Sequence, residues 1–310
     1  MSTLVIDHRD VALDYELECL LIRQKHHPVR SIPLHQLQRI LCMHNTQIST
    51  RLIGHCQKAG IDFIVLNSRY SEYSFAVHAN HQLQAGRRLQ QYQLTVDRPQ
   101  SFELARRLVR HKLAVSYRLL ARQPTSAGST HAQKIQRQIY HTLRINCDDM
   151  ATLRGLEGYA QRALYQYWQS CIPSALGFRQ RQRRPPPDPV NALLSLTFTL
   201  VYHEAIRQSL RHGLDPWLGF YHQPAAGRRS LACDLMEPLR PLVEYWVMRC
   251  FADGELDRRH FALQHGQSML GKEGRSHYYQ LWYQSLPDWS RKLGKYARLL
   301  ARYCDARAAA

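Results

Sequence analysis

The fold class is decided by the stretch Phe102-Glu-Leu-Ala-Arg-Arg-Leu-Val-Arg-His-Lys-Leu-Ala-Val-Ser-Tyr-Arg-Leu-Leu120, in which leucine and valine recur with helical spacing. Its basic residues Arg106, Arg107, Arg110 and Lys112 are expected to lie largely off the Leu/Val stripe, so the stretch predicts a long amphipathic helix. Helical spacing returns at residues 131–145, 150–170 and 190–210. The chain from about residue 80 onward is therefore predicted to be helical.

The first 80 residues have a different pattern, with short runs rich in Val, Ile and Leu between polar breaks. The expected strands cover residues 3–6, 11–15, 18–22, 30–33, 39–42, 62–66 and 72–78. One helix is expected at residues 46–59, with Gly60 placed to end it. The sequence thus predicts an α+β fold, in which a small N-terminal β-sheet domain with one helix (1–80) precedes a larger all-α domain (81–310).

The charge of the chain is concentrated in the second of these parts. The 310 residues include 42 Lys+Arg and 24 Asp+Glu, a formal net charge of +18. Residues 1–80 contribute 8 basic and 7 acidic residues, and the remaining 230 contribute 34 and 17. A neutral end could arise by chance, but an acidic ligand on the second part explains the asymmetry better, and nucleic acid is the first partner to consider. With 45% apolar residues the chain is not intrinsically disordered.

Cysteine spacing and hydropathy indicate the cellular location of the chain. The eight cysteines lie at least 14 residues apart, so no CxxC zinc knuckle is present. The N-terminus reaches a charge at Asp7, which argues against a signal peptide, and no run approaches the ~20 apolar residues of a membrane span. A soluble, cytoplasmic protein is expected.

Acidic and imidazole residues at a few positions could carry chemistry. On a helix, Glu157 shares a face with Leu164 and Trp168, where a carboxylate needs an arginine, a proton or a metal as partner. It could equally be an acid favoured by a helix N-terminus. Asp234 and Glu237 are three residues apart, so on a helix they share one face. They could form salt bridges to arginine instead.

His222 lies in a turn-rich connection and by itself could be an ordinary polar loop residue. Taken with Glu157, Asp234 and Glu237, it suggests a Glu/His/Glu (or Asp) site for a hard divalent cation. Carboxylate oxygens with one imidazole suit Mg²⁺ or Mn²⁺ better than zinc. Such an ion beside a basic surface would polarise a phosphodiester.

Four motifs, in order, carry a resemblance to a known family. They are Leu156-Glu-Gly-Tyr-Ala160, Pro187-Asp-Pro-Val-Asn-Ala-Leu-Leu-Ser195, Gly213-Leu-Asp-Pro-Trp-Leu-Gly-Phe-Tyr-His222 and Ser230-Leu-Ala-Cys-Asp-Leu-Met-Glu-Pro-Leu-Arg-Pro241. Together with Ile32-Pro-Leu34 and Gly60-Ile-Asp-Phe-Ile-Val-Leu66 they closely resemble the CRISPR-associated endonuclease/integrase family Cas1. The resemblance covers essentially the whole chain.

This resemblance implies a homodimer that assembles with the small partner Cas2 for CRISPR spacer acquisition, an antiviral defence. The implied reaction is transesterification, in which a 3′-hydroxyl of incoming double-stranded spacer DNA attacks a phosphodiester at the CRISPR repeat. The implied metal ligands are Glu157, His222 and Glu237, and Asp234 is implied to assist. The neutral residues 1–80 fit dimerisation and partner docking.

The basic residues of the helical part predict a sequence-independent grip on DNA. The set proposed for phosphate contacts consists of Arg106, Arg107, Arg110, Arg179, Arg181, Arg183 and Arg184. The last four belong to an arginine-rich strap, residues 179–189, whose three consecutive prolines forbid a helix. Two other functions remain open: a non-catalytic basic nucleic-acid-binding scaffold, and a metallonuclease that uses water as its nucleophile.

Overall fold

The computed structural model describes residues 2–67, 73–79, 84–122, 129–264 and 266–308. The chain forms two compact units, Met1–Leu83 and Gln84–Ala310. The division lies a few residues beyond the boundary predicted from the charge and hydropathy patterns.

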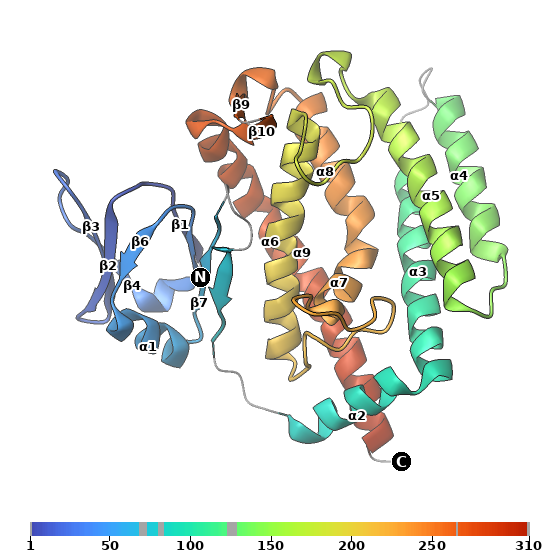
Figure 1. Ribbon diagram of the computed structural model, residues 1–310, viewed down its shortest axis with the longest axis horizontal. Coiled ribbons are helices and arrows are strands. Elements are labelled where there is room, and N and C mark those ends of the chain that lie inside the picture. The colour runs from blue at the N-terminus through green and yellow to red at the C-terminus, as the bar shows by residue number, and fades with distance from the viewer. Residues whose placement is uncertain (1, 68–72, 80–83, 123–128, 265, 309–310) are drawn as a thin grey trace. The chain divides into compact units, whose positions relative to one another are not determined.

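The described residues of the N-terminal unit form two four-stranded sheets, one α-helix, as the fold class predicted, and the short 3-10 helix η1 Leu34–Gln36 (Figure 1). One sheet has the order β1-β5-β7-β8, with β1, β5 and β7 parallel and β8 antiparallel. The other has the order β4-β3-β2-β6. The bounds are β1 Ser2–Ile6, β2 Val11–Glu16, β3 Cys19–Gln24, β4 Arg30–Pro33, β5 Leu37–Cys42, β6 Thr46–Ile48, α1 Thr50–Ala59, β7 Asp62–Val65 and β8 Phe75–Val77.

Leucine, isoleucine and phenylalanine side chains fill the core of this unit, among them Leu13, Ile40, Leu52 and Phe63, each at most 1% exposed. The only helix expected here is shorter than predicted. Residues 46–48 form strand β6, because their backbone pairs in parallel with β2. Ser49 then caps α1 by accepting a hydrogen bond from the backbone N–H of Leu52 (3.2 Å). Gly60 ends the helix in the left-handed conformation (φ 75°), as predicted. Of the strand expected at 72–78, residue 72 lies outside the described residues.

The C-terminal unit is built mainly of helices. Its helical bounds are α2 Ala85–Val96, α3 Arg98–Ala121, α4 Ser129–Arg144, α5 Met150–Cys171, η3 Ser174–Leu176, α6 Pro189–Arg211, α7 Ser230–Met236, η4 Glu237–Leu239, α8 Arg240–Ala252, η5 Arg258–His260 and α9 Lys272–Ala308. Helices α3, α4 and α5 pack side by side, and α6 packs against α7, α8 and α9 (Figure 1). The four predicted long helices are therefore present as α3, α4, α5 and α6.

The C-terminal unit also contains a β-hairpin, so it is not entirely helical. Strands β9 (Phe261–Gln264) and β10 (Gln267–Leu270) pair antiparallel, and β10 lies against α6. The prediction of an all-α domain missed them because each strand is only four residues long. Among the residues that the structure describes, no helix combines the length and apolarity that a membrane span requires.

Helix α6 is the central element of the C-terminal unit. Asp188 caps it by accepting from the backbone N–H of Asn191 (2.8 Å), and Pro189 occupies its first turn, where a missing N–H costs nothing. Leu193, Leu194 and Val201 are at most 1% exposed. The loop that follows α6 and the short helix α7 packed against it bring the acidic motifs of the sequence together.

Candidate functional site

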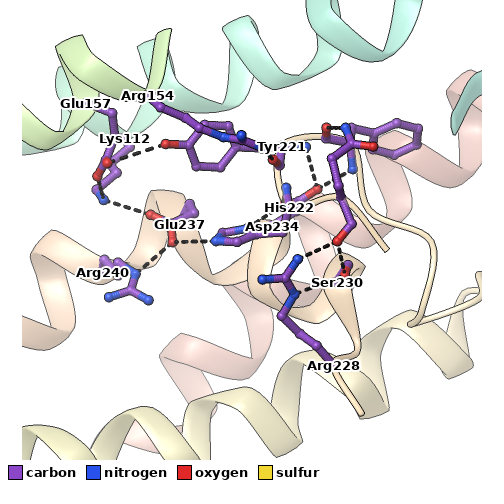
Figure 2. Close-up of polar contacts among 12 residues, drawn as sticks. Lys112, Arg154, Glu157, Tyr221, His222, Arg228, Ser230, Asp234, Glu237 and Arg240 are labelled. Carbon is purple, nitrogen blue, oxygen red and sulfur yellow. Dashed lines mark hydrogen bonds and ion pairs between the residues drawn. The ribbon is translucent and has the colours of Figure 1, made fainter. Parts of the chain in front are cut away.

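Five segments of the C-terminal unit contribute side chains to one polar cluster (Figure 2). Glu157 comes from α5 and Lys112 from α3. His222 comes from the loop between α6 and α7, Asp234 from α7, and Glu237 from the first position of η4. The four residues proposed for catalysis therefore lie together. Lys112, which sequence reasoning assigned to the outer face of its helix, lies among them.

Asp234 organises the loop that carries His222. Its side chain accepts hydrogen bonds from the backbone N–H groups of Phe220 (2.6 Å), Tyr221 (3.1 Å) and His222 (2.9 Å). A fourth contact joins its Oδ1 to Nδ1 of the His222 ring (2.7 Å). Asp234 is only 2% exposed, so water cannot reach these N–H groups of the loop, and the carboxylate provides the hydrogen-bond acceptors in its place.

The ring orientation of His222 follows from that fourth contact. An ionised carboxylate only accepts, so Nδ1 carries a proton and donates it, and in a neutral ring the lone pair is on Nε2. Nε2 lies 3.9 Å from Oε1 of Glu237. Gly219 makes the arrangement possible, because a Cβ there would lie 2.6 Å from the backbone oxygen of His222 and 2.7 Å from the backbone carbon of Ser230.

Glu237 is a buried carboxylate surrounded by cations. Its Oε2 accepts from Lys112 Nζ (2.7 Å) and its Oε1 from Arg240 Nε (2.8 Å). Burial raises the pKa of Glu237, but the charges of Arg240, Lys112 and His222 outweigh burial and bring this pKa to about 2. The carboxylate is therefore ionised at neutral pH.

Glu157 faces Glu237 across Lys112. Its Oε1 accepts from the Lys112 ammonium, and its Oε2 accepts from the Tyr221 hydroxyl (3.4 Å). Arg154, one turn earlier on α5, donates to the backbone oxygen of Tyr221 (3.2 Å). These contacts tie α5 to the loop that carries His222.

The donor set fits a hard divalent cation. Two carboxylates and one imidazole nitrogen are ligands that Mg²⁺ and Mn²⁺ accept, and the Asp234–His222 pair is the arrangement that fixes an imidazole for metal binding. The ammonium of Lys112 lies between the two carboxylates. Within the described part of the chain, no group of three or more His, Cys, Asp or Glu already has metal-binding geometry.

Further polar residues surround the cluster formed by Lys112, Glu157, His222, Asp234 and Glu237. Arg240 lies over the ring of Phe198 (4.8 Å), which holds its guanidinium beside Glu237. Glu244, 0% exposed, accepts from Gln161 (3.0 Å) and from the Tyr165 hydroxyl (3.0 Å), and burial raises its pKa.

Sequence reasoning missed Lys112, although a signal was present. Ala105, Val109, Lys112, Ser116 and Leu119 recur at alternating spacings of four and three, which is the buried stripe of α3. Lys112 is 2% exposed, so its expected place off the stripe was wrong. The long side chain of lysine allows its charge to reach carboxylates on neighbouring elements.

The arginines proposed to bind DNA fall into three groups. Arg110, Arg179, Arg183 and Arg184 are exposed. Arg106 and Arg107 both pair with Glu103 one turn away. Arg181 differs from its neighbours on the strap: it donates to the side chains of Asn191 (2.9 Å) and Ser195 (3.0 Å), and burial lowers its pKa. Its guanidinium fastens the strap to α6.

Comparison with known proteins gives a consistent result. The sequence matches the family described as "CRISPR associated protein Cas1" over residues 4–284. It is 31% identical over 291 residues to the CRISPR-associated endonuclease Cas1 1 of Thermodesulfovibrio yellowstonii, covering 92% of this chain and 91% of that protein.

Solved structures share the fold. A Cas1 protein from Thermotoga maritima superposes with a TM-score of 0.86 at 18% identity, covering 98% of this chain and 97% of that one. A casposase bound to its integration product superposes with a TM-score of 0.84 at 17% identity, covering 99% of this chain and 91% of that one. At these identities the likeness concerns the fold.

Proposed function

Because this chain belongs to the CRISPR-associated Cas1 family of endonucleases and integrases, we propose that it inserts new spacer DNA into a CRISPR repeat by metal-dependent transesterification. One observation carries the proposal. Glu157, Glu237 and Nε2 of His222 converge from three segments, and Asp234 holds the ring of His222 in place. This donor set is the one that the family resemblance assigns to the metal.

The chemistry needs an oxygen nucleophile and a stabilised leaving oxygen. The 3′-hydroxyl of the spacer DNA loses its proton to solvent and forms a new bond to phosphorus, while the bond from phosphorus to the 3′-oxygen of the flanking strand breaks and that oxygen takes up a proton. A divalent ion, when bound, would supply charge stabilisation for both oxygens. Glu157, Glu237 and His222 would hold that ion, and Asp234 keeps the Nδ1 proton on the far side of the ring. With water as nucleophile, the same residues would cut DNA.

DNA and protein partners follow from the charge distribution and from structural relatives. The fold neighbours include a Cas1–DNA complex and a Cas6-RT-Cas1–Cas2 complex. For this chain we propose binding of double-stranded spacer DNA and repeat DNA to the basic C-terminal unit. We also propose a homodimer that docks Cas2, with the nearly neutral residues 1–80 serving dimerisation and docking.

The decisive experiment uses a supercoiled plasmid that carries a CRISPR array, labelled DNA with free 3′-hydroxyl ends, and Cas2. Joined product is expected with Mg²⁺ or Mn²⁺ and should disappear with EDTA. Cleavage without joining would support the metallonuclease instead. DNA binding with neither product, at any metal concentration, would support the non-catalytic scaffold.

The strap arginines give a separate prediction on DNA affinity. Replacing Arg179, Arg183 and Arg184 with glutamine should weaken DNA binding and reduce the slope of log K against log salt by about two to three, since each phosphate contact contributes ~0.9. Arg181 stays intact because it holds the strap in place.

The control for this prediction removes the same net charge elsewhere. Arg249, Arg259 and Arg291 are exposed and pair with nearby aspartates, and their triple glutamine variant should keep the original slope. Fluorescence anisotropy over a salt series measures both. An equal loss of slope in the two triple variants would show that net charge, and not the strap, determines affinity.

A further inference from the structure

We propose that Lys112 is a built-in counter-ion that competes with the divalent cation for the space between Glu157 and Glu237. The inference rests on the proposed function, because it assumes that these carboxylates bind the metal. Lys112 would then weaken metal binding and set the metal concentration at which the site fills.

The contacts of Lys112 carry the inference. Its Nζ donates to Glu157 Oε1 and to Glu237 Oε2 (2.7 Å), so one ammonium bridges carboxylates from α5 and η4. The exposed fractions of the side chains are 3% for Lys112, 16% for Glu157 and 5% for Glu237. Buried carboxylates that contact one ammonium require that positive charge between them, and Lys112 provides it from within the chain.

The position of this charge makes the two cations mutually exclusive. A metal that bridges both carboxylates from the side of Lys112 would bind the same oxygens, Oε1 of Glu157 and Oε2 of Glu237, that Lys112 now contacts. If the ammonium stayed in place, two positive charges would lie within a few ångströms of each other in a site from which water is largely excluded. Lys112 has a flexible four-carbon stem, so it can withdraw while its backbone remains in α3.

Arg240 cannot take over this role. It contacts the other oxygen of Glu237, Oε1, and its guanidinium lies over the ring of Phe198. Arg240 therefore leaves Oε2 of Glu237 and Oε1 of Glu157 to Lys112. Neutralising Lys112 should free these two oxygens for the metal and leave the Arg240 contact unchanged.

The test measures Mn²⁺ affinity of the full-length chain without DNA, by electron paramagnetic resonance of free Mn²⁺ and by calorimetry. Lys112→Met removes the charge at similar volume, and Lys112→Gln keeps a hydrogen-bond donor without the charge. Both should bind Mn²⁺ at least about tenfold more tightly than the wild type, since a neighbouring charge at this distance changes proton affinity by one to three pKa units. Lys292→Met, which breaks a partly exposed ion pair with Asp288, should leave the Mn²⁺ affinity unchanged.

Thermal unfolding gives a second readout. The Lys112 variants should be less stable than the wild type in EDTA, because two carboxylates lose their counter-ion, and they should gain more from Mn²⁺. If both Lys112 variants fold and bind Mn²⁺ no more tightly than the wild type, the proposal that Lys112 competes with the metal is wrong. Glu237→Gln identifies the site: if no form of the chain shows Mn²⁺ binding that Glu237→Gln abolishes, the metal-dependent function falls as well. If the wild type shows such binding and the Lys112 variants do not tighten it, only the competition falls.

Discussion

Glu157→Gln should abolish detectable strand joining, a loss of at least about a hundredfold, while DNA affinity changes less than twofold. The amide keeps the size of the side chain but loses the negative charge that a hard cation requires. DNA binding should survive because the exposed arginines of the strap lie outside this polar cluster. The measurement is the yield of joined product from a supercoiled CRISPR-array plasmid at saturating Mn²⁺, with DNA affinity determined in parallel.

Glu255→Gln is the matched control for this variant. Glu255 is exposed and pairs with His277 (2.8 Å), outside the five segments that build the site, so its replacement should leave joining unchanged. Joining by Glu157→Gln at near wild-type yield would remove Glu157 from the metal site and favour its reading as an ordinary helix acid.

Asp234→Asn should both destabilise the protein and reduce joining strongly. An amide nitrogen would replace one of the two oxygens that accept three backbone N–H groups, so donors would face donors in a buried pocket. The free energy of unfolding should fall by about 3 kcal/mol, as for loss of a buried charged partner. Joining should fall by ~10- to 100-fold, because His222 loses the partner that orients its ring. Urea denaturation and the joining assay measure the two effects.

The control comes from the same loop. Asp215 is partly exposed and accepts a hydrogen bond from the backbone N–H of Trp217 (2.9 Å), a turn that asparagine also supports. Asp215→Asn should therefore change stability and joining little. If Asp234→Asn is as stable and as active as Asp215→Asn, the loop does not depend on this carboxylate.

Residue spacing predicted the secondary structure around each candidate site residue, but it did not predict that these residues lie close together in the fold. Helical periodicity predicted that Asp234 and Glu237 share one helical face and that Glu157 lies on a helix. The structure has Asp234 on α7, Glu237 at the start of the adjoining η4, and Glu157 on α5. Periodicity describes one element at a time, so it could not show that Glu157 faces Glu237 across 80 residues of chain. Only the family resemblance joined the motifs before the fold was known.

Lys112 and residues 46–48 show two ways in which local patterns mislead. Leucines and valines alone predict a stripe of α3 that leaves Lys112 out, whereas the smaller buried residues Ala105 and Ser116 place Lys112 on the buried face. Residues 46–48 continue a helical pattern, but pairing with β2 takes them into a sheet. In both cases a partner distant in sequence decides the outcome.

The four backbone and ring contacts of Asp234 have a consequence for how the site is assembled during folding. They join residues at most 14 positions apart, so this half of the site has low contact order and can form early. Glu157 reaches Tyr221 over 64 positions, and Lys112 reaches Glu237 over 125, so the opposing half arrives late. A folding intermediate would hold the histidine before its facing carboxylate reaches it. The complete set of proposed metal ligands would then exist only once the helical unit has folded.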